Sequence, residues 1–264
     1  MQLARRPAHP ALASQVRDLA GWHERADGPV RRSELPGARV VLVISFGPTL
    51  DVDGRRFTSF AAGVHDRPAL TEHPGEGHGV QAYLAPLAAR RLLGIPMGEL
   101  ARDVVELEDL LGRQAAGELA ERLYEAPGWG ARLDLLERAI ARRVLAAPPL
   151  PAALEWGWRR LLQSDGAVPI GALAEELGWS RRHLAATFRE QLGLPPKTIA
   201  RLLRFERAAE RLRRQDPVDL GRLALDCGYY DHAHLDRDFR EFSGATPSEY
   251  RRVTSVQDVA ALAA

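Results

Sequence analysis

Residues 173–189 read LAEELGWSRRHLAATFR, and residues 223–240 read LALDCGYYDHAHLDRDFR. A Gly-x-x-Pro sequence follows each stretch, at residues 193–196 and at residues 244–247. The two stretches align with an offset of 50 residues up to a shared glycine–aromatic pair and of 51 residues after it. So many matches with a single insertion indicate two copies of one supersecondary unit.

Each copy contains the parts of a helix-turn-helix unit. In the first copy we expect a short helix over residues 170–177 and a turn at Gly178, because glycine adopts left-handed conformations at low cost. Ser180 is a favourable N-cap for a second helix, in which Leu184 and Phe188 are four residues apart and face inward. The second copy repeats these three roles at Asp231, Leu235 and Phe239.

Residues 167–252 as a whole resemble the paired helix-turn-helix domain of the AraC/XylS family of bacterial transcription regulators. The second copy, together with residues 244–251, is similar to the most recognisable motif of that family. His232-Ala233 stands where many members carry a glutamine–serine pair, which affects the expected base preference and not the fold. The resemblance implies a non-enzymatic regulator without cofactor that reads double-stranded DNA in the major groove, with RNA polymerase as a further candidate partner.

Two arginines are the candidate base readers. Arg182 and Arg237 lie in the early turns of the two recognition helices, and an arginine can donate two hydrogen bonds to guanine O6 and N7. Ala186 and Ala233 offer apolar contact, for example to a thymine methyl group. The other residues expected to shape the readout are Arg181, His183, His232 and Asp236. Phosphate contacts, which position a protein without specifying sequence, are expected from Ser180, Lys197 and Arg240.

One long helix is expected over residues 196–214, between the two copies. Its arginines recur at spacings of three and four residues, at Arg201, Arg204, Arg207, Arg211 and Arg214. Such a row can face DNA or polymerase, or it can be a solvated face supported by pairs such as Glu210–Arg214. We favour the second interpretation. In either case the helix sets the distance between the recognition helices, which must enter major grooves about 34 Å apart.

The chain of 264 residues is long enough for two domains. The prolines of residues 148–151 favour a boundary there, because prolines in series stop a helix and stiffen a linker. We therefore predict an effector-sensing and dimerisation domain over residues 1–147, a DNA-binding domain over 148–252 and a tail over 253–264.

Charge, cysteine content and the N-terminus restrict the class of protein. Residues 148–252 hold 17 Arg and Lys against 15 Asp and Glu, so attraction to DNA must come from the placement of charges. Cys227 is the single cysteine, which excludes an internal disulfide, and we expect it to be buried and inert. No signal peptide or long apolar run is evident, so we expect a cytoplasmic protein.

The first 147 residues predict a β-rich, cupin-like domain followed by a helical hairpin, so the whole chain is of the α+β class. Strands are expected over 40–44, 57–64 and 79–84, and Asp53-Gly54 is a hairpin turn signal. The pattern becomes helical from Pro86, with two amphipathic helices over 107–124 and 129–145. This order resembles the effector and dimerisation half of AraC-type regulators, and residues 80–94 are also similar to the N-terminal domain of an actinobacterial subgroup.

The second of these amphipathic helices suggests how the chain assembles. An apolar stripe at helical spacing consists of Leu133, Leu136, Ile140 and Val144. We expect a homodimer through the hairpin of residues 107–145, because one chain does not necessarily cover this stripe. Five aromatic residues are candidates for the lining of a ligand pocket, although core packing explains them equally well. They are Trp22, Phe46, Phe57, Phe60 and Tyr83.

Acidic and histidine residues between positions 65 and 78 raise the question of a metal site. The candidate ligands His65, Asp66, His73, Glu76 and His78 do not have the spacing of a cupin metal site, so we expect none. No catalytic motif is evident either. Two alternatives stay open, namely a constitutive DNA-binding regulator whose N-terminal half only dimerises and a cupin-type enzyme with a DNA-binding tail.

Overall fold

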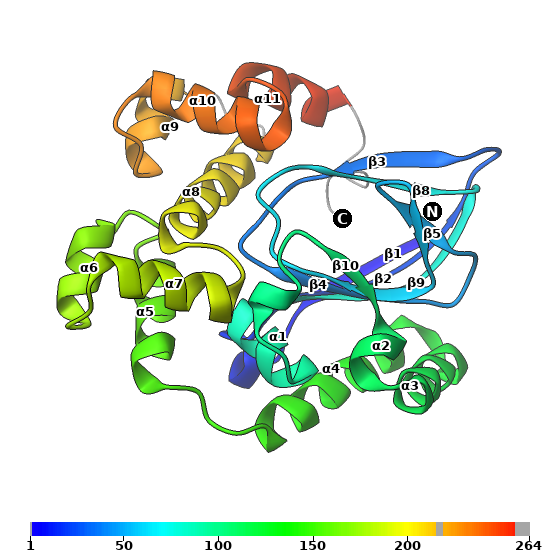
Figure 1. Ribbon diagram of the computed structural model, residues 1–264. Helices are drawn as coiled ribbons and strands as arrows, with labels where there is room; N and C mark the ends of the chain where they lie inside the picture. The colour runs from blue at the N-terminus through cyan, green and yellow to red at the C-terminus, as the bar shows by residue number, and fades with distance from the viewer. Residues whose placement is uncertain (1, 215–218, 257–264) are drawn as a thin grey trace.

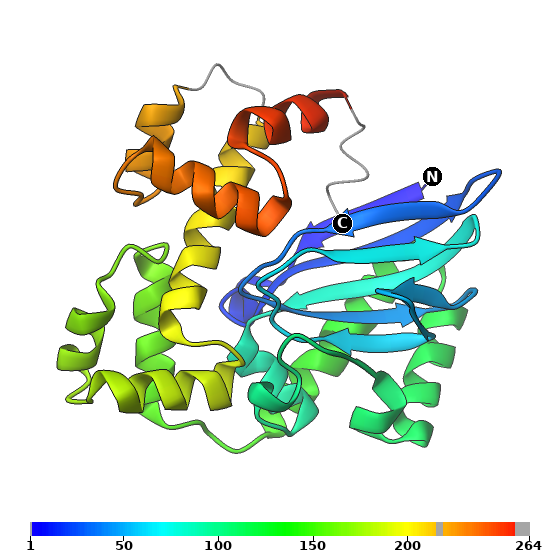
Figure 2. The same cartoon turned by 45° about the horizontal axis from the view of Figure 1, so that its top comes forward.

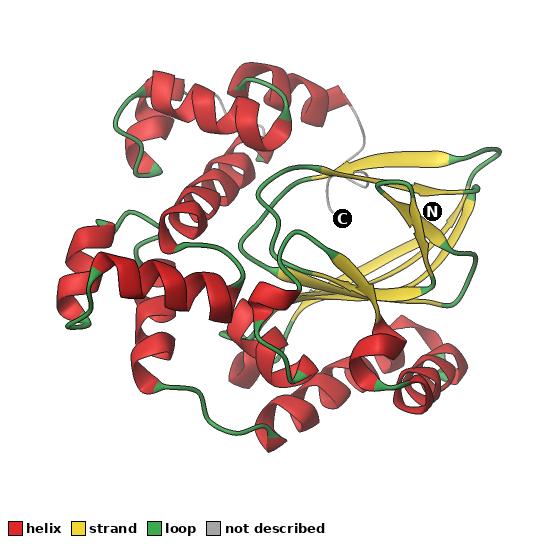
Figure 3. Ribbon diagram, in the orientation of Figure 1, coloured by secondary structure: helices red, strands yellow, loops and turns green. Residues whose placement is uncertain are grey.

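The computed structural model describes residues 2–214 and 219–256. Within these ranges every strand lies before Leu107, and the C-terminal domain is entirely helical (Figures 1 and 3). The predicted α+β class, with a β-rich N-terminal domain before an all-α domain, is therefore confirmed.

Two antiparallel sheets form the N-terminal domain. The larger sheet contains, in spatial order, β1 (Gln2–Pro7), β2 (Val16–Arg25), β9 (Glu76–Leu84), β4 (Val40–Ser45), β7 (Ser59–Ala62) and β10 (Val104–Glu106). The smaller sheet contains β3 (Val30–Glu34), β8 (Ala69–His73), β5 (Leu50–Val52) and β6 (Arg55–Phe57). The two sheets face each other (Figure 2). Residues of both sheets line one cavity between them.

Helices cover the outer face of the larger sheet. Alternation along β9 places Val80, Ala82 and Leu84 on this covered face and Gln81 and Tyr83 on the cavity face. The covering helices include α1 (Pro86–Leu93) and α4 (Gly128–Ala146), which contact each other, and α4 also contacts β2.

The apolar stripe of α4 is buried within the chain. Its residues Leu133, Leu136, Ile140 and Val144 are at most 3% exposed. The expectation that this stripe is left uncovered for a partner was wrong, because the sheet and α1 occupy it. A homodimer stays a prediction, but it no longer has this argument.

Several predicted elements of the N-terminal domain are confirmed. The runs at 40–44 and 79–84 are strands, residues 129–145 lie within α4, and the hairpin turn has positive φ at both Asp53 and Gly54. The predicted helix over 107–124 was wrong as a single helix. It divides at Gly112, where φ is +84°, into α2 (Leu107–Leu111) and α3 (Arg113–Glu125). The predicted strand over 57–64 is likewise divided, between β6 and β7.

The C-terminal domain follows a connector at residues 147–151. Its helices are α5 (Ala152–Gln163), α6 (Ile170–Glu176), α7 (Arg181–Leu192), α8 (Pro196–Arg213), α9 (Leu220–Asp226), α10 (His232–Ser243) and α11 (Pro247–Val256). Helix α11 continues past the boundary predicted at residue 252, and residues 257–264 lie outside the described residues. None of the described helices combines the length and apolarity needed to span a membrane.

One hydrophobic core runs through both domains. The predicted inward residues Leu184, Phe188, Leu235 and Phe239 are fully buried. The same core includes Met97 of the short 3₁₀ helix η2 (Met97–Glu99), because α7 packs on η2 and on α1. A second 3₁₀ helix, η1 (Pro10–Leu12), follows β1. The N-terminal domain therefore contacts the first helix-turn-helix unit directly.

Two glycines test how tightly α8 packs on the loop after α5. Gly166 and Gly244 have φ of +75° and +73°, but a Cβ on Gly166 would lie 2.2 Å from the Ala200 carbonyl oxygen, whereas nothing lies within 4 Å of one on Gly244. We expect Gly244→Ala to cost about 1–2 kcal/mol of unfolding free energy for conformation alone. Gly166→Ala should cost roughly 3–5 kcal/mol, because overpacking adds to that cost. Equal losses in urea denaturation would contradict this account.

Candidate nucleic-acid interface and ligand cavity

The recognition helix of the first unit, α7, presents its early residues to solvent. The Ser180 side chain accepts a hydrogen bond from the His183 backbone N–H at 3.1 Å, so the predicted N-cap is confirmed. Arg181, Arg182 and His183 are exposed. Ala186 and, at the start of α8, Lys197 are also exposed. Helix α7 packs on η2, while Arg189 and Glu190 near its C-terminal end stay exposed.

The second recognition helix, α10, has the same cap and a different surface. The Asp231 carboxylate accepts from the His234 backbone N–H at 2.8 Å. Asp236 lies 3.1 Å from His232 and 3.5 Å from Arg240, so these three side chains form a charged group within the helix. Arg237 and Ala233 are exposed. An acidic side chain on this surface can accept from cytosine N4 but repels phosphates.

The two candidate base readers differ in their position. Arg182 is the second residue of α7, while Arg237 is in the second turn of α10, where the aligned residue of the first unit is Ala186. Within the described residues, neither arginine has an ion pair. Both guanidinium groups can therefore donate hydrogen bonds to a base without breaking an ion pair inside the protein.

The arginines of α8 bind the flanking units to this helix. Arg201 pairs with buried Asp238 at 2.7 Å and with Glu241. The remaining partners are the Gly166 carbonyl for Arg204, Asp165 for Arg207, Asp226 for Arg211 and Glu210 for Arg214. The favoured interpretation, a solvated face supported by pairs within the helix, holds only for Glu210–Arg214, because the other four arginines pair with other elements.

Glu206, also on α8, connects the helix to the N-terminal domain. Its Oε1 accepts from Arg39 at 2.6 Å and from the Ala38 backbone N–H at 3.0 Å, and its Oε2 accepts from Arg17 at 3.1 Å. Gly37 leaves the necessary space, because a Cβ there would lie 2.1 Å from Oε1. The carboxylate thus has a backbone donor and two guanidinium groups, which sequence reasoning did not identify.

The cavity between the two sheets has a volume of about 170 Å³. Trp22, Phe60 and Tyr83 of the five candidate aromatic residues line it. Phe57 packs on Phe60 in the adjoining core, and Phe46 lies against His78 and Tyr124 outside the cavity. The aliphatic part of the wall comes mainly from Leu3, Val41, Val43, Leu50, Val52, Ala62 and Val104.

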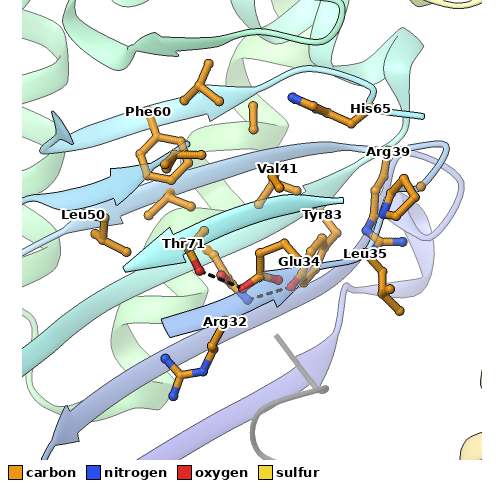
Figure 4. A pocket seen from close by; sticks show the side chains of 18 of the residues that line it. Arg32, Glu34, Leu35, Arg39, Val41, Leu50, Phe60, His65, Thr71 and Tyr83 are labelled. Carbon is orange, nitrogen blue, oxygen red and sulfur yellow. Dashed lines mark hydrogen bonds between the residues drawn. The ribbon is translucent and has the colours of Figure 1, made fainter. Parts of the chain in front are cut away.

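Charged side chains gather at the side of the cavity formed by β3. Arg32 donates to both oxygens of Glu24, at 2.7 and 2.6 Å, and His73 lies 3.0 Å from Glu24. Burial raises the pKa of Glu24, but the hydrogen bonds from Arg32 and His73 outweigh it, so the net pKa is lowered. Burial raises the pKa of Glu34, and it raises the pKa of Tyr83 to about 12. Figure 4 shows Arg32, Glu34 and Tyr83 around the cavity.

The other histidines and the cysteine are accounted for by local contacts. His65 Nδ1 lies 2.5 Å from the Gly63 carbonyl, and His78 lies 3.3 Å from Arg132. Across residues 2–214 and 219–256, no three His, Cys, Asp or Glu side chains come close enough to hold a metal ion. Cys227 is buried, as predicted, and burial raises the pKa of its thiol.

Comparison with known proteins shows what the C-terminal domain is similar to. A family described as "Helix-turn-helix domain" matches residues 173–253. An uncharacterized HTH-type transcriptional regulator of Staphylococcus aureus (strain MSSA476) is 33% identical over 82 residues, which are 31% of this chain and 11% of that protein. The F1 operon positive regulatory protein of Yersinia pestis is 31% identical over 86 residues, which are 33% of this chain and 28% of that protein. The chain therefore matches less than a third of the length of either relative.

A solved structure of ToxT from Vibrio cholerae is similar over 96% of this chain and 98% of its own, with a TM-score of 0.48 and 9% identity. The fold and exposed helices described above define residues 173–253 as a DNA-binding domain with paired helix-turn-helix units. This domain is of the AraC/XylS type, the type found in transcription regulators.

The ion pair between Arg201 and Asp238 predicts a strong coupling between α8 and α10. Arg201→Met leaves the carboxylate of Asp238, which is 1% exposed, without its counter-ion. We expect a loss of about 3–5 kcal/mol of unfolding free energy, while Arg201→Met combined with Asp238→Leu should recover most of it. Urea denaturation of both single variants and the double variant measures the coupling. Additive single losses would show that the pair does not hold the two helices together.

Proposed function

We propose that this chain is a sequence-specific DNA-binding transcription regulator, with α7 and α10 in successive major grooves. The doubled unit on one rigid helix is the observation that carries the proposal. Exposed residues at the start of each recognition helix are suited to base contacts, and the exposed Lys197, Ser180 and Arg240 are our candidates for phosphate contacts that position the domain. The same DNA-binding role accounts for both units without any catalytic group.

We further propose that the N-terminal cavity binds a small-molecule effector. A largely apolar cavity with a few convergent polar groups is the usual form of such a site. Contact between η2 and α7, and between Arg39 and Glu206, gives an effector two routes to the DNA-binding domain. A homodimer and a contact with RNA polymerase stay predictions that follow from the family resemblance.

Single substitutions on the recognition helices test the DNA-binding role. Arg182→Ala and Arg237→Ala should each cost about 1–3 kcal/mol of operator binding and relax the preference at one base step. Lys197→Ala should weaken binding to operator and scrambled duplexes alike and should flatten the salt dependence. Gel shifts at fixed salt make the comparison, with Arg138→Ala on α4 as an exposed control. Operator affinity unchanged by both substitutions would refute the assignment of base readers.

A thermal-denaturation screen against metabolites tests the effector role. A ligand that binds the cavity at 100 times its Kd should stabilise the native state by about 2.7 kcal/mol. The same ligand should change operator affinity in the gel shift. A panel in which every stabilising compound leaves operator affinity unchanged would favour a regulator that acts without an effector.

A further inference from the structure

The charged side of the cavity begins with the alternation of β3. Its residues Arg32 and Glu34 point inward and line the cavity, whereas Arg31 and Ser33 are exposed. Figure 4 shows the Glu34 carboxyl group beside Thr71 and Tyr83, within the space that the sheets enclose. A carboxyl group in this position meets any molecule that enters.

Glu34 lacks a direct ion pair within the described residues. The guanidinium group of Arg32 is taken by both oxygens of Glu24, and that of Arg39 is taken by Glu206. Glu34 itself receives a hydrogen bond from the Thr71 hydroxyl, at 3.3 Å. Arg32 and Arg39 attract this carboxyl group only at a distance, and burial raises its pKa. A cation in the cavity that paired with it directly would favour its charged form.

Glu34 differs in this respect from the other acidic residues of the cavity wall. Glu24 has Arg32 and His73, and Glu72 is paired with Arg31 on the neighbouring strand. Arg67 also lines the cavity, but it is exposed, and the charged groups that act on Glu34 are Arg32 and Arg39. The unmatched charge is therefore a property of one residue.

We propose that the ligand of this cavity is an apolar amine whose ammonium group pairs with Glu34. This inference rests on the proposed effector role of the cavity and adds the chemical class of the ligand. The aliphatic and aromatic wall takes the apolar body of the molecule, with Val41, Phe60 and Val43 among its residues. The volume of about 170 Å³ is close to that of cavities that hold benzene, so the body is one ring or a branched chain of similar size.

The same ligand acts on the contact with α8. Arg39 interacts electrostatically with Glu34 on the cavity side and with Glu206 on the side of α8. An ammonium group on Glu34 offsets the attraction on the cavity side, so binding of an amine changes the electrostatic environment of Arg39 beside its ion pair with Glu206.

Three probes of one shape and different charge test the ligand class on the full chain. They are 2-phenylethylamine, which is a cation at neutral pH, 2-phenylethanol, which is neutral, and 3-phenylpropionate, which is an anion. Isothermal titration should show that the amine binds at least about tenfold more tightly than the alcohol. Glu34→Gln should remove this preference and leave the affinity for the alcohol unchanged. The matched control Glu72→Gln, whose carboxylate is already paired, should keep it.

The wild-type comparison decides the proposal even if the Glu34→Gln chain is unstable. Amine and alcohol that bind equally, an amine preference that survives Glu34→Gln in a folded chain, or no binding of any probe at millimolar concentration would each overturn it. Preferred binding of 3-phenylpropionate would overturn the ligand class but support an effector cavity. Operator binding, measured separately, distinguishes all of these results from a failure of the proposed DNA-binding role.

Discussion

Helix α8 is the element on which the arrangement of this protein depends. Its arginines reach back to Asp165 and Gly166 before the first unit and forward to Asp226 and Asp238 in the second. These contacts tie the helix to the loop after α5 and to the second unit. Two recognition helices can meet DNA together only if their separation is fixed. A row of arginines, which suggests contact with nucleic acid, therefore serves here to hold the two recognition elements in place.

A second constraint acts on the larger sheet, because one of its faces packs against helices and the other lines the cavity. One face is covered by helices and carries mostly small or aliphatic side chains, such as Ala82 and Leu42, although His78 on this face contacts Arg132 and Trp129 of α4. The other faces the cavity and carries Gln81, Tyr83 and Trp22 among apolar residues. Because alternation along a strand assigns residues strictly to one face or the other, the same nine residues of β9 supply both the core and the ligand site. The cavity face is opposed by the smaller sheet, whose own side chains point inward and line the cavity, and not by a helix.

This division explains which parts could be predicted from the sequence. The paired units were found because their glycines, caps and buried Leu–Phe pairs fall at fixed spacings, and β4 because it is buried on both faces. Strands β3 and β8 were missed, since inward positions such as Arg32, Glu34 and His73 carry charge where a strand normally carries apolar residues. Trp22, Phe60 and Tyr83 were identified by their type alone. Glu34, Arg39 and Glu206 were not, because their significance lies in which partner each one has, and the pairing of Arg39 with Glu206 across 167 residues leaves no local pattern.

Arg39 is where the two constraints meet. Its guanidinium lies over the Tyr83 ring on the cavity side and donates to Glu206 on the side of α8. Burial lowers the pKa of Arg39, but Glu206, Tyr83 and Glu34 together outweigh that effect, so the net pKa is raised and the group stays charged. A permanent charge between two carboxyl groups on different domains responds to any change in either one. Arg39 therefore links the electrostatics of the cavity to the attachment of α8, and a ligand can shift that attachment only by the difference in its affinity for two arrangements of the protein.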